Sequence, residues 1–179
     1  MNEQLNLFAQ RYSCRSFTGV LPEKEALEAI GLAAVQSPSG MNRQPWLVNV
    51  ITDKTFLDEM DKKAMAVMAE MEDKAMYERF IARGGKIFYD APCMYLILKE
   101  PGTDLDCGIV AENIALAATA LGLGNVICGM AGIPFDSDGD FRARAGFVDG
   151  YEFGMTVLVG YATGPGSQHE TDMSKLRFL

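Results

Sequence analysis

The sequence contains one histidine, His169, and four cysteines that form no Cys-x-x-Cys pair. A zinc site needs several closely spaced His, Cys or carboxylate ligands, and a Ser-His-Asp or Cys-His site needs a histidine beside its nucleophile. The sequence therefore argues against a metal enzyme and against catalysis by a protein nucleophile, although a single Cys-His pair stays open as an alternative. Three of the cysteines lie in apolar stretches, so we expect reduced, mostly buried thiols.

The sequence also lacks long basic runs and long apolar runs. It has 16 Lys and Arg against 24 Asp and Glu, a net charge of -8, and never more than two basic residues in succession. Nucleic acids and anionic membranes attract clustered positive charge, so neither is expected as a partner. No stretch is suited to a transmembrane helix, and residues 1–5 show no basic segment followed by an apolar one. These absences predict a cytoplasmic protein.

The chain has 179 residues, of which 49% are hydrophobic and 22% charged, enough for one domain over residues 1–179 with a sizeable core. Apolar periodicity and turn residues predict helices over residues 2–12, 22–35, 53–82 and 106–121. Strands are expected over residues 46–52, 91–99, 125–128 and 153–161, followed by a polar tail over residues 162–179. Strands separated by helices predict a mixed α+β fold, a three-layer α/β/α domain.

Two of the expected helices have unusual compositions. The first, over residues 53–82, holds five methionines, Met60, Met65, Met68, Met71 and Met76. The spacing of three between Met65, Met68 and Met71 favours a stripe facing the core, and a pliable lid above a pocket is the alternative. The second, over residues 106–121, is rich in alanine and lets a neighbouring helix approach closely, which suits either a core or a subunit interface.

Residues 37–46, Ser-Pro-Ser-Gly-Met-Asn-Arg-Gln-Pro-Trp, connect an expected helix to an expected strand. The two prolines fix φ angles, Gly40 allows close backbone approach, and the amides of Asn42 and Gln44 each offer donors and an acceptor. Such a loop can recognise the polar edge of a flat ring. The alternative is an ordinary connection in which Trp46 anchors the chain in the core.

A second polar segment lies upstream, at residues 11–17, Arg-Tyr-Ser-Cys-Arg-Ser-Phe. Arg11 and Arg15 stand four residues apart with Ser13 between them, and guanidinium groups match phosphate oxygens well. A small phosphorylated ligand is the expected partner. The alternative is a solvated basic patch.

The glycine-rich stretches do not match nucleotide-binding motifs. The segment Gly122-Leu-Gly-Asn-Val-Ile has isoleucine where G-x-G-x-x-G requires its third glycine, and it follows a helix instead of a strand. Gly84-Gly85-Lys86 lacks the first glycine of a P-loop, because Phe80 stands there. Residues 129–132, Gly-Met-Ala-Gly, form either a loop whose N-H groups face a ligand or a plain turn.

Taken together, these segments resemble the FMN-dependent nitroreductase family over nearly the whole chain. The resemblance rests on Arg-x-Ser-x-Arg-x-Phe at 11–17, on Pro-Ser-x-x-Asn-x-Gln-Pro-Trp at 38–46, and on Asp-x-Gly at 106–108 leading through Glu112-Asn113 to Leu-Gly-Leu-Gly at 121–124. It implies a mainly antiparallel sheet flanked by helices and a homodimer with FMN sites at the subunit interface. The interface would include the alanine-rich helix.

By this resemblance, the phosphate and ribityl end of FMN would be held by Arg11, Tyr12, Ser13 and Arg15. The flavin ring would be reached from the other subunit by Pro38, Ser39, Gly40 and Asn42, with Gln44 also a cofactor residue. A backbone amide near Gly129 and Met130 would approach flavin N5.

The tail departs from the family pattern, which often places Pro-Arg-x-Arg at the phosphate. Here Gln-His-Glu stands at 168–170, so Lys175 is the first candidate for the phosphate contact, ahead of Arg177, and His169 is a further one or a surface residue. Arg43 is a candidate cation for the reduced ring, with a solvated side chain as the alternative.

The resemblance implies an enzyme in which the flavin carries the chemistry, so no residue is expected to act as a catalytic nucleophile. NADH or NADPH would deliver hydride, and a nitroaromatic, quinone or similar small molecule would then accept two electrons in a ping-pong cycle. Two alternatives stay open: a flavoenzyme of the same fold with other chemistry, such as reductive dehalogenation or a dehydrogenase reaction, and a non-enzymatic flavin-binding or redox-sensing protein.

Overall fold

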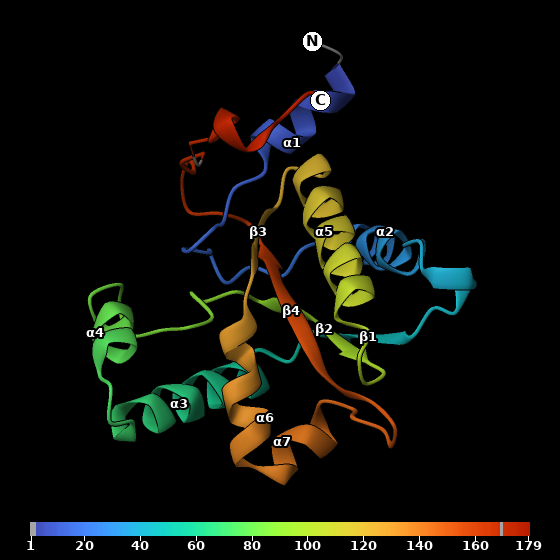
Figure 1. Cartoon of the computed structure of the whole chain (residues 1–179). Helices are drawn as coiled ribbons and strands as arrows, with labels where there is room; N and C mark the ends of the chain where they lie inside the picture. The colour runs from blue at the N-terminus through green and yellow to red at the C-terminus, as the bar shows by residue number, and fades with distance from the viewer. Residues whose placement is uncertain (1–2, 169) are drawn as a thin grey trace.

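One sheet of four strands runs through the middle of the protein in the order β1-β2-β4-β3 (Figure 1). The strands are β1 (Trp46–Ile51), β2 (Cys93–Lys99), β3 (Gly124–Ile127) and β4 (Glu152–Gly160), and all three pairings are antiparallel. The computed structural model describes residues 3–168 and 170–179. The strands expected from the sequence are confirmed to within about two residues at each end.

Seven α-helices lie among the described residues: α1 (Asn6–Gln10), α2 (Lys24–Val35), α3 (Lys54–Glu70), α4 (Ala75–Ile81), α5 (Asp104–Ala120), α6 (Ile133–Ser137) and α7 (Gly139–Arg144). The same residues also include four short 3-10 helices: η1 (Glu3–Leu5), η2 (Gly40–Asn42), η3 (Gly129–Gly132) and η4 (Met173–Lys175). In the described part of the chain, no helix has both the length and the apolar composition needed to cross a membrane.

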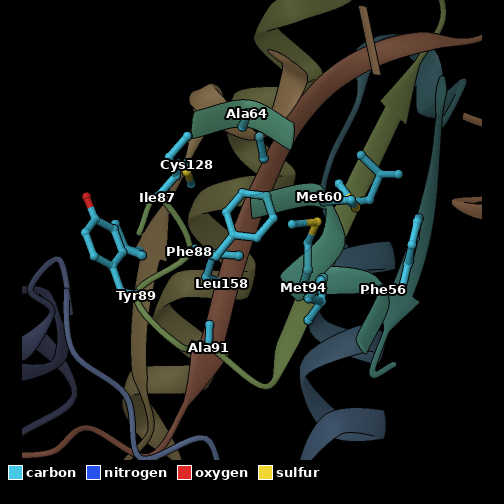
Figure 2. Close-up of a cluster of buried hydrophobic side chains, with 14 of the residues drawn as sticks. Phe56, Met60, Ala64, Ile87, Phe88, Tyr89, Ala91, Met94, Cys128 and Leu158 are labelled. Carbon is cyan, nitrogen blue, oxygen red and sulfur yellow. The ribbon is translucent and has the colours of Figure 1, made fainter. Parts of the chain in front are cut away.

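Successive side chains of β2 point to opposite faces of the sheet, and both faces are covered. Met94, Leu96 and Leu98 join a core with α3 and α6, whereas Cys93, Tyr95 and Ile97 join a core with α2 and α5. Figure 2 shows part of the first core, where Phe56, Met60 and Ala64 of α3 gather with Met94 of β2 and Leu158 of β4. The expected three-layer α+β architecture is therefore confirmed.

The expected single helix over residues 53–82 is wrong, because the structure divides it into α3 and α4. The chain becomes extended at Met71, with ψ 148°, and acidic side chains at Glu70, Glu72 and Asp73 oppose the partial negative charge of a helix C-terminus. Asp73 then accepts a hydrogen bond from the N-H of Ala75, the first residue of α4, at 2.9 Å. Residues 133–144, for which no helix was expected, form α6 and α7.

The expected methionine stripe is confirmed only in part. Met60 and Met68 are fully buried and Met65 is half-buried, whereas Met71 and Met76 are exposed. Met71 leaves the stripe because α3 ends just before it. On the other face of the sheet, Ala111 and Ala118 of α5 are buried in the core that α5 shares with α2.

Candidate functional site

Residues 11–18 lie as an extended segment between β3 and the tail that follows β4. Ser13 forms a parallel bridge with Asn125 of β3, whose carbonyl also accepts the N-H of Cys14 at 2.8 Å. On the other side, the N-H of Thr163 donates to the carbonyl of Ser16 at 3.1 Å, and the two hydroxyl groups hydrogen bond at 2.9 Å. The segment that carries Arg11, Ser13 and Arg15 is therefore fixed from both sides.

A cavity of about 300 Å³ opens where this segment meets the tail. None of its lining residues is acidic, and one is cationic: Tyr12, Ser13, Cys14, Arg15, Ser16, Thr163, Gly164, Pro165, Gly166 and Ser167. The lining contains a guanidinium group and several hydroxyl groups but no carboxylate, in a chain of net charge -8. Guanidinium and hydroxyl donors of this kind are suited to a phosphate group. We call this cavity the anion pocket.

Tyr12, Ser13 and Arg15 were expected in this pocket from the sequence, whereas residues 163–167 were not. The tail segment reads Thr-Gly-Pro-Gly-Ser, a turn-forming stretch with two hydroxyl groups, and only its position after β4 brings it beside residues 11–17. The pairing of Phe17 with Ala162 creates this contact between segments far apart in sequence. Sequence periodicity carries no signal for such a bridge.

Tyr12 and Gly166 are in close contact across the anion pocket. A Cβ atom added to Gly166 would lie 1.9–2.3 Å from three atoms of the Tyr12 ring, so the ring lies directly against the glycine backbone. Burial raises the pKa of both the Tyr12 phenol and the Cys14 thiol above their ordinary values. Both groups are therefore neutral at physiological pH and leave Arg15 as the charged group of the pocket.

The other cationic residues expected at the phosphate do not line this pocket. Arg11 is half-buried directly after α1. Lys175 is exposed and lies 3.8 Å from the carboxylate of Asp172, and Arg177 is also exposed. His169 lies outside the described residues. The contact of a tail cation with the phosphate stays a prediction.

The loop that joins α2 to β1 has an unusual backbone. Three non-glycine residues within four positions adopt the left-handed conformation, with φ 54° at Met41, 56° at Asn42 and 49° at Gln44. The Ser39 hydroxyl accepts the N-H of Gln44 at 2.9 Å, and the side-chain amides of Gln44 and Asn42 hydrogen bond at 3.0 Å. We call residues 38–44 the amide loop.

The amide loop is exposed at Pro38, Gly40, Asn42 and Gln44, while Trp46 behind it is buried against the core of α2 and α5. Trp46 thus anchors the chain in the core, the role that the sequence offered as an alternative. Figure 1 shows the loop beside α2, on the far side of α5 from the N-terminal segment and the tail. The amide loop and the anion pocket of one protomer are therefore separate surfaces.

The glycine-rich segment after β3 forms η3, the 3-10 helix Gly129–Gly132. Its start is fixed by Thr156 of β4, whose carbonyl accepts the N-H of Cys128 at 2.8 Å and whose hydroxyl donates to the Cys128 carbonyl at 2.7 Å. Gly129 and Met130, the residues expected near a ring nitrogen, thus follow a rigid strand end. Burial raises the pKa of the Cys128 thiol to about 11, so this cysteine stays protonated.

A second cavity, of about 340 Å³, lies between α3 and the loop at Gly85 and Lys86. Its lining mixes both signs of charge, with Asp58, Asp61 and Lys62 from α3. Asp61 accepts the backbone N-H groups of Ile87 and Phe88, so it has a structural role. Within residues 3–168 and 170–179, no group of three or more His, Cys, Asp or Glu side chains could hold a metal ion.

Known proteins resemble this chain in both sequence and structure. The sequence model of the Nitroreductase family matches residues 8–161. A relative from Archaeoglobus fulgidus, described as an NADH dehydrogenase/NAD(P)H nitroreductase, is 29% identical over 138 residues, which cover 73% of this chain and 69% of the relative.

Two solved structures resemble the fold over its full length. A nitroreductase with bound FMN from Desulfitobacterium hafniense DCB-2 is 45% identical, with a TM-score of 0.97 and coverage of 100% of this chain and 99% of the other. A nitroreductase with bound FMN from Bacteroides fragilis NCTC 9343 is 24% identical, with a TM-score of 0.87 and full coverage of both chains.

Proposed function

The chain belongs to the nitroreductase family, and from that membership we propose that it is an FMN-dependent oxidoreductase. In this proposal, NADH or NADPH is the electron donor, and a nitroaromatic, a quinone or a similar small molecule is the acceptor. The observation that carries the proposal is the anion pocket, because its donors and its lack of carboxylates suit the phosphate end of FMN. The 45% identical relative whose structure holds FMN supports the same cofactor.

The residues of the anion pocket suit an FMN phosphate in their charge and in their hydrogen-bond donors. Arg15 supplies a guanidinium group, and Ser13 and Ser16 supply hydroxyl donors at the joint between the N-terminal segment and the tail, where the Ser16 hydroxyl accepts a hydrogen bond from Thr163. Arg11, Lys175 and Arg177 are proposed as further cationic contacts. The phosphate would then be held by groups from both ends of the described chain.

We propose that the flavin ring is held jointly by η3 of one protomer and the amide loop of a second copy. In Figure 1 the amide loop and the N-terminal segment that carries Arg15 lie on opposite sides of α5, which supports a site shared between two protomers. Exposed apolar side chains occur in the loop at Met41 and in the C-terminal part of α2 at Leu32 and Val35. A homodimer would cover these side chains and complete the site.

When bound, FMN supplies the hydride and electron transfer chemistry, as flavins do in general. The protein's part is to bind and orient. A backbone N-H group near Gly129 and Met130 would approach flavin N5, and the start of this segment is fixed by Thr156. The amides of Asn42 and Gln44 would meet the polar edge of the ring. Electron donor and acceptor would use the same ring face in turn, which predicts ping-pong kinetics.

The buried cysteines do not compete with this chemistry. Burial raises the pKa of Cys93 to about 12 and that of Cys107 to about 11, so neither thiol ionises near neutral pH. The thiolate, not the thiol, is the reactive form of cysteine. We therefore expect replacement of either cysteine by serine to leave the pH dependence of turnover unchanged.

The proposal is tested by adding NADH or NADPH to the FMN-loaded protein without oxygen. Loss of the yellow colour, followed by its return when a nitroaromatic or a quinone is added, is the expected result. If neither NADH nor NADPH removes the yellow colour, the protein binds flavin but lacks this activity. A colourless protein that takes up no FMN would contradict the proposal as a whole.

A further inference from the structure

The amide loop has a backbone that its own sequence does not favour. Left-handed φ angles at non-glycine residues cost on the order of 1 kcal/mol each, less for Asn than for Met or Gln. Hydrogen bonds inside the loop join near neighbours only, such as the N-H of Arg43 to the carbonyl of Gly40 at 3.1 Å. Contacts from outside the loop are therefore needed to keep this conformation.

The first outside contact comes from Asn113 in the middle of α5. Its side-chain N-H₂ group donates to the carbonyl of Ala33 at 3.3 Å and to the hydroxyl of Ser37 at 2.9 Å. The Ser37 hydroxyl in turn donates to the carbonyl of Ala34 at 2.7 Å. Because carbonyl groups only accept, the orientation of the Asn113 amide is fixed. Asn113 thus joins the last turn of α2 to the first residue before the amide loop.

The second outside contact comes from Glu100, directly after β2. Its N-H donates to the carbonyl of Pro45 at 3.0 Å, and its carboxylate forms an ion pair with the Arg43 guanidinium at 2.7 Å. Arg43 is therefore paired within its own chain. Glu100, which follows the inner strand β2, thus holds Arg43 in the amide loop and Pro45 directly after it.

We propose that Asn113 and Glu100 are positioning residues that keep the amide loop in its ligand-binding conformation before any ligand arrives. The proposal rests on the function proposed above, in which this loop meets the flavin ring. A loop that is already ordered loses less conformational entropy on binding, so its fixation raises affinity. Removal of either attachment releases one end of the loop, and the left-handed residues then relax.

The first experiment titrates FMN into the apoprotein and follows the fluorescence of Trp46, the only tryptophan of the chain. Glu100→Gln keeps the size of the side chain but removes its charge, and we expect about a fivefold rise in the Kd for FMN. Asn113→Leu removes both donors at similar volume, and we expect about a tenfold rise. The exchanged pair Arg43→Glu with Glu100→Arg restores opposite charges and should return the Kd to within about twofold of the unmodified protein.

The matched control is Glu59→Gln, which breaks an ion pair with Arg144 of the same length, 2.7 Å, between side chains of similar exposure. This change should leave the Kd for FMN unaltered. An unchanged Kd in both Glu100→Gln and Asn113→Leu would overturn the proposal. So would an equal rise in Glu59→Gln, because the effect would then be a general one.

The second experiment needs no flavin and separates the two proposals. Hydrogen exchange in the apoprotein should show protected N-H groups at Asn42, Arg43 and Gln44, and both variants should lose this protection. If the unmodified apoprotein shows no protection there, the positioning role is wrong. If the protection follows the expected pattern but no form of the protein binds FMN, the positioning role stands and the proposed function fails.

Discussion

Asp61 shows how one buried carboxylate can fix a segment of the core. It is 6% exposed, and its Oδ1 accepts the N-H of Ile87 at 2.7 Å and that of Phe88 at 3.1 Å. Figure 2 places Ile87 and Phe88 within the core that α3 covers. The carboxylate thus supplies an acceptor to two backbone groups that are buried away from water.

Two substitutions distinguish the role of Asp61 as a hydrogen-bond acceptor from the role of its negative charge. Asp61→Ala leaves two buried N-H groups without an acceptor, and we expect the free energy of unfolding to fall by about 2–4 kcal/mol. Asp61→Asn keeps a side-chain oxygen that can accept the same hydrogen bonds, so its free energy of unfolding should fall by less. Urea denaturation of the apoprotein measures both values, and equal losses in the two variants would contradict the acceptor role.

The ionisation of Asp61 has a separate effect, on how the stability of the protein depends on pH. Burial is the main cause that raises the pKa of this carboxyl above its ordinary value, so the folded protein binds the proton more tightly than the unfolded chain. The contribution of Asp61 to stability is therefore full below the ordinary carboxyl pKa and is lost as pH rises through the raised value. Asp61→Asn has no such group, so its stability relative to the unmodified protein should improve as pH rises toward neutrality.

Gly166 lies against the Tyr12 ring in the anion pocket, so its replacement should weaken ligand binding there. A methyl group in Gly166→Ala would displace the Tyr12 ring, and we expect the Kd for FMN to rise about tenfold. Gly164→Ala adds the same methyl group in the same segment, where nothing lies within 4 Å of it, and should have a much smaller effect. Equal effects in the two variants would show that the ring contact is unimportant for binding.

At the scale of elements, α4 has fewer buried residues than the long helices α2, α3 and α5. Only Phe80 of α4 is buried, and its ring contacts that of Tyr89 with centroids 6.2 Å apart. Met76 and Ile81 on the same helix are exposed. Loss of one side chain should therefore release this element without unfolding the sheet.

The matching experiment is Phe80→Ala, followed by hydrogen exchange. Protection over residues 75–81 should fall at least tenfold, because the helix loses its one buried side chain. Protection over β2 should change little, since β2 is buried between two cores. A parallel loss of protection in both elements would mean that α4 is part of the cooperative core.

The sequence predicted elements well where one physical signal dominated. The continuous apolar run of β2 and the alanine-rich face of α5 were both located to within two residues. The break between α3 and α4 was missed, because the acidic residues that end α3 follow an unbroken apolar period. The tail segment of the anion pocket was missed as well, since a bridge between Phe17 and Ala162 leaves no trace in local periodicity.

At the scale of the whole molecule, the proposed site has parts from two copies of the chain, and this can be tested by complementation. An Asn42→Ala protein loses a ring contact, and an Arg15→Ala protein loses a phosphate contact. Mixed dimers of the two should contain one site with both defects and one site with neither. We expect the mixture to regain flavin binding in up to a quarter of all sites, if subunits exchange at random.

The measurement is the amount of FMN retained after subunit exchange, compared with each variant alone. A pair of variants from the same half of the site, Arg15→Ala with Ser13→Ala, is the control and should regain nothing. A mixture of Asn42→Ala and Arg15→Ala that regains no more than this control would argue for a site within one protomer.

The anion pocket joins residues 12–16 to residues 163–167, and this has a consequence for the timing of synthesis. During translation, residues 12–16 leave the ribosome early. The other part of the pocket lining, residues 163–167, is missing until Ser167 has left the exit tunnel. The last strand, β4 (Glu152–Gly160), is followed closely by residues 163–167, so the sheet and the pocket are completed by the same late stretch of the chain. Capture of a phosphorylated cofactor would therefore be one of the last events of biogenesis, and a chain released before residue 163 would be left without it.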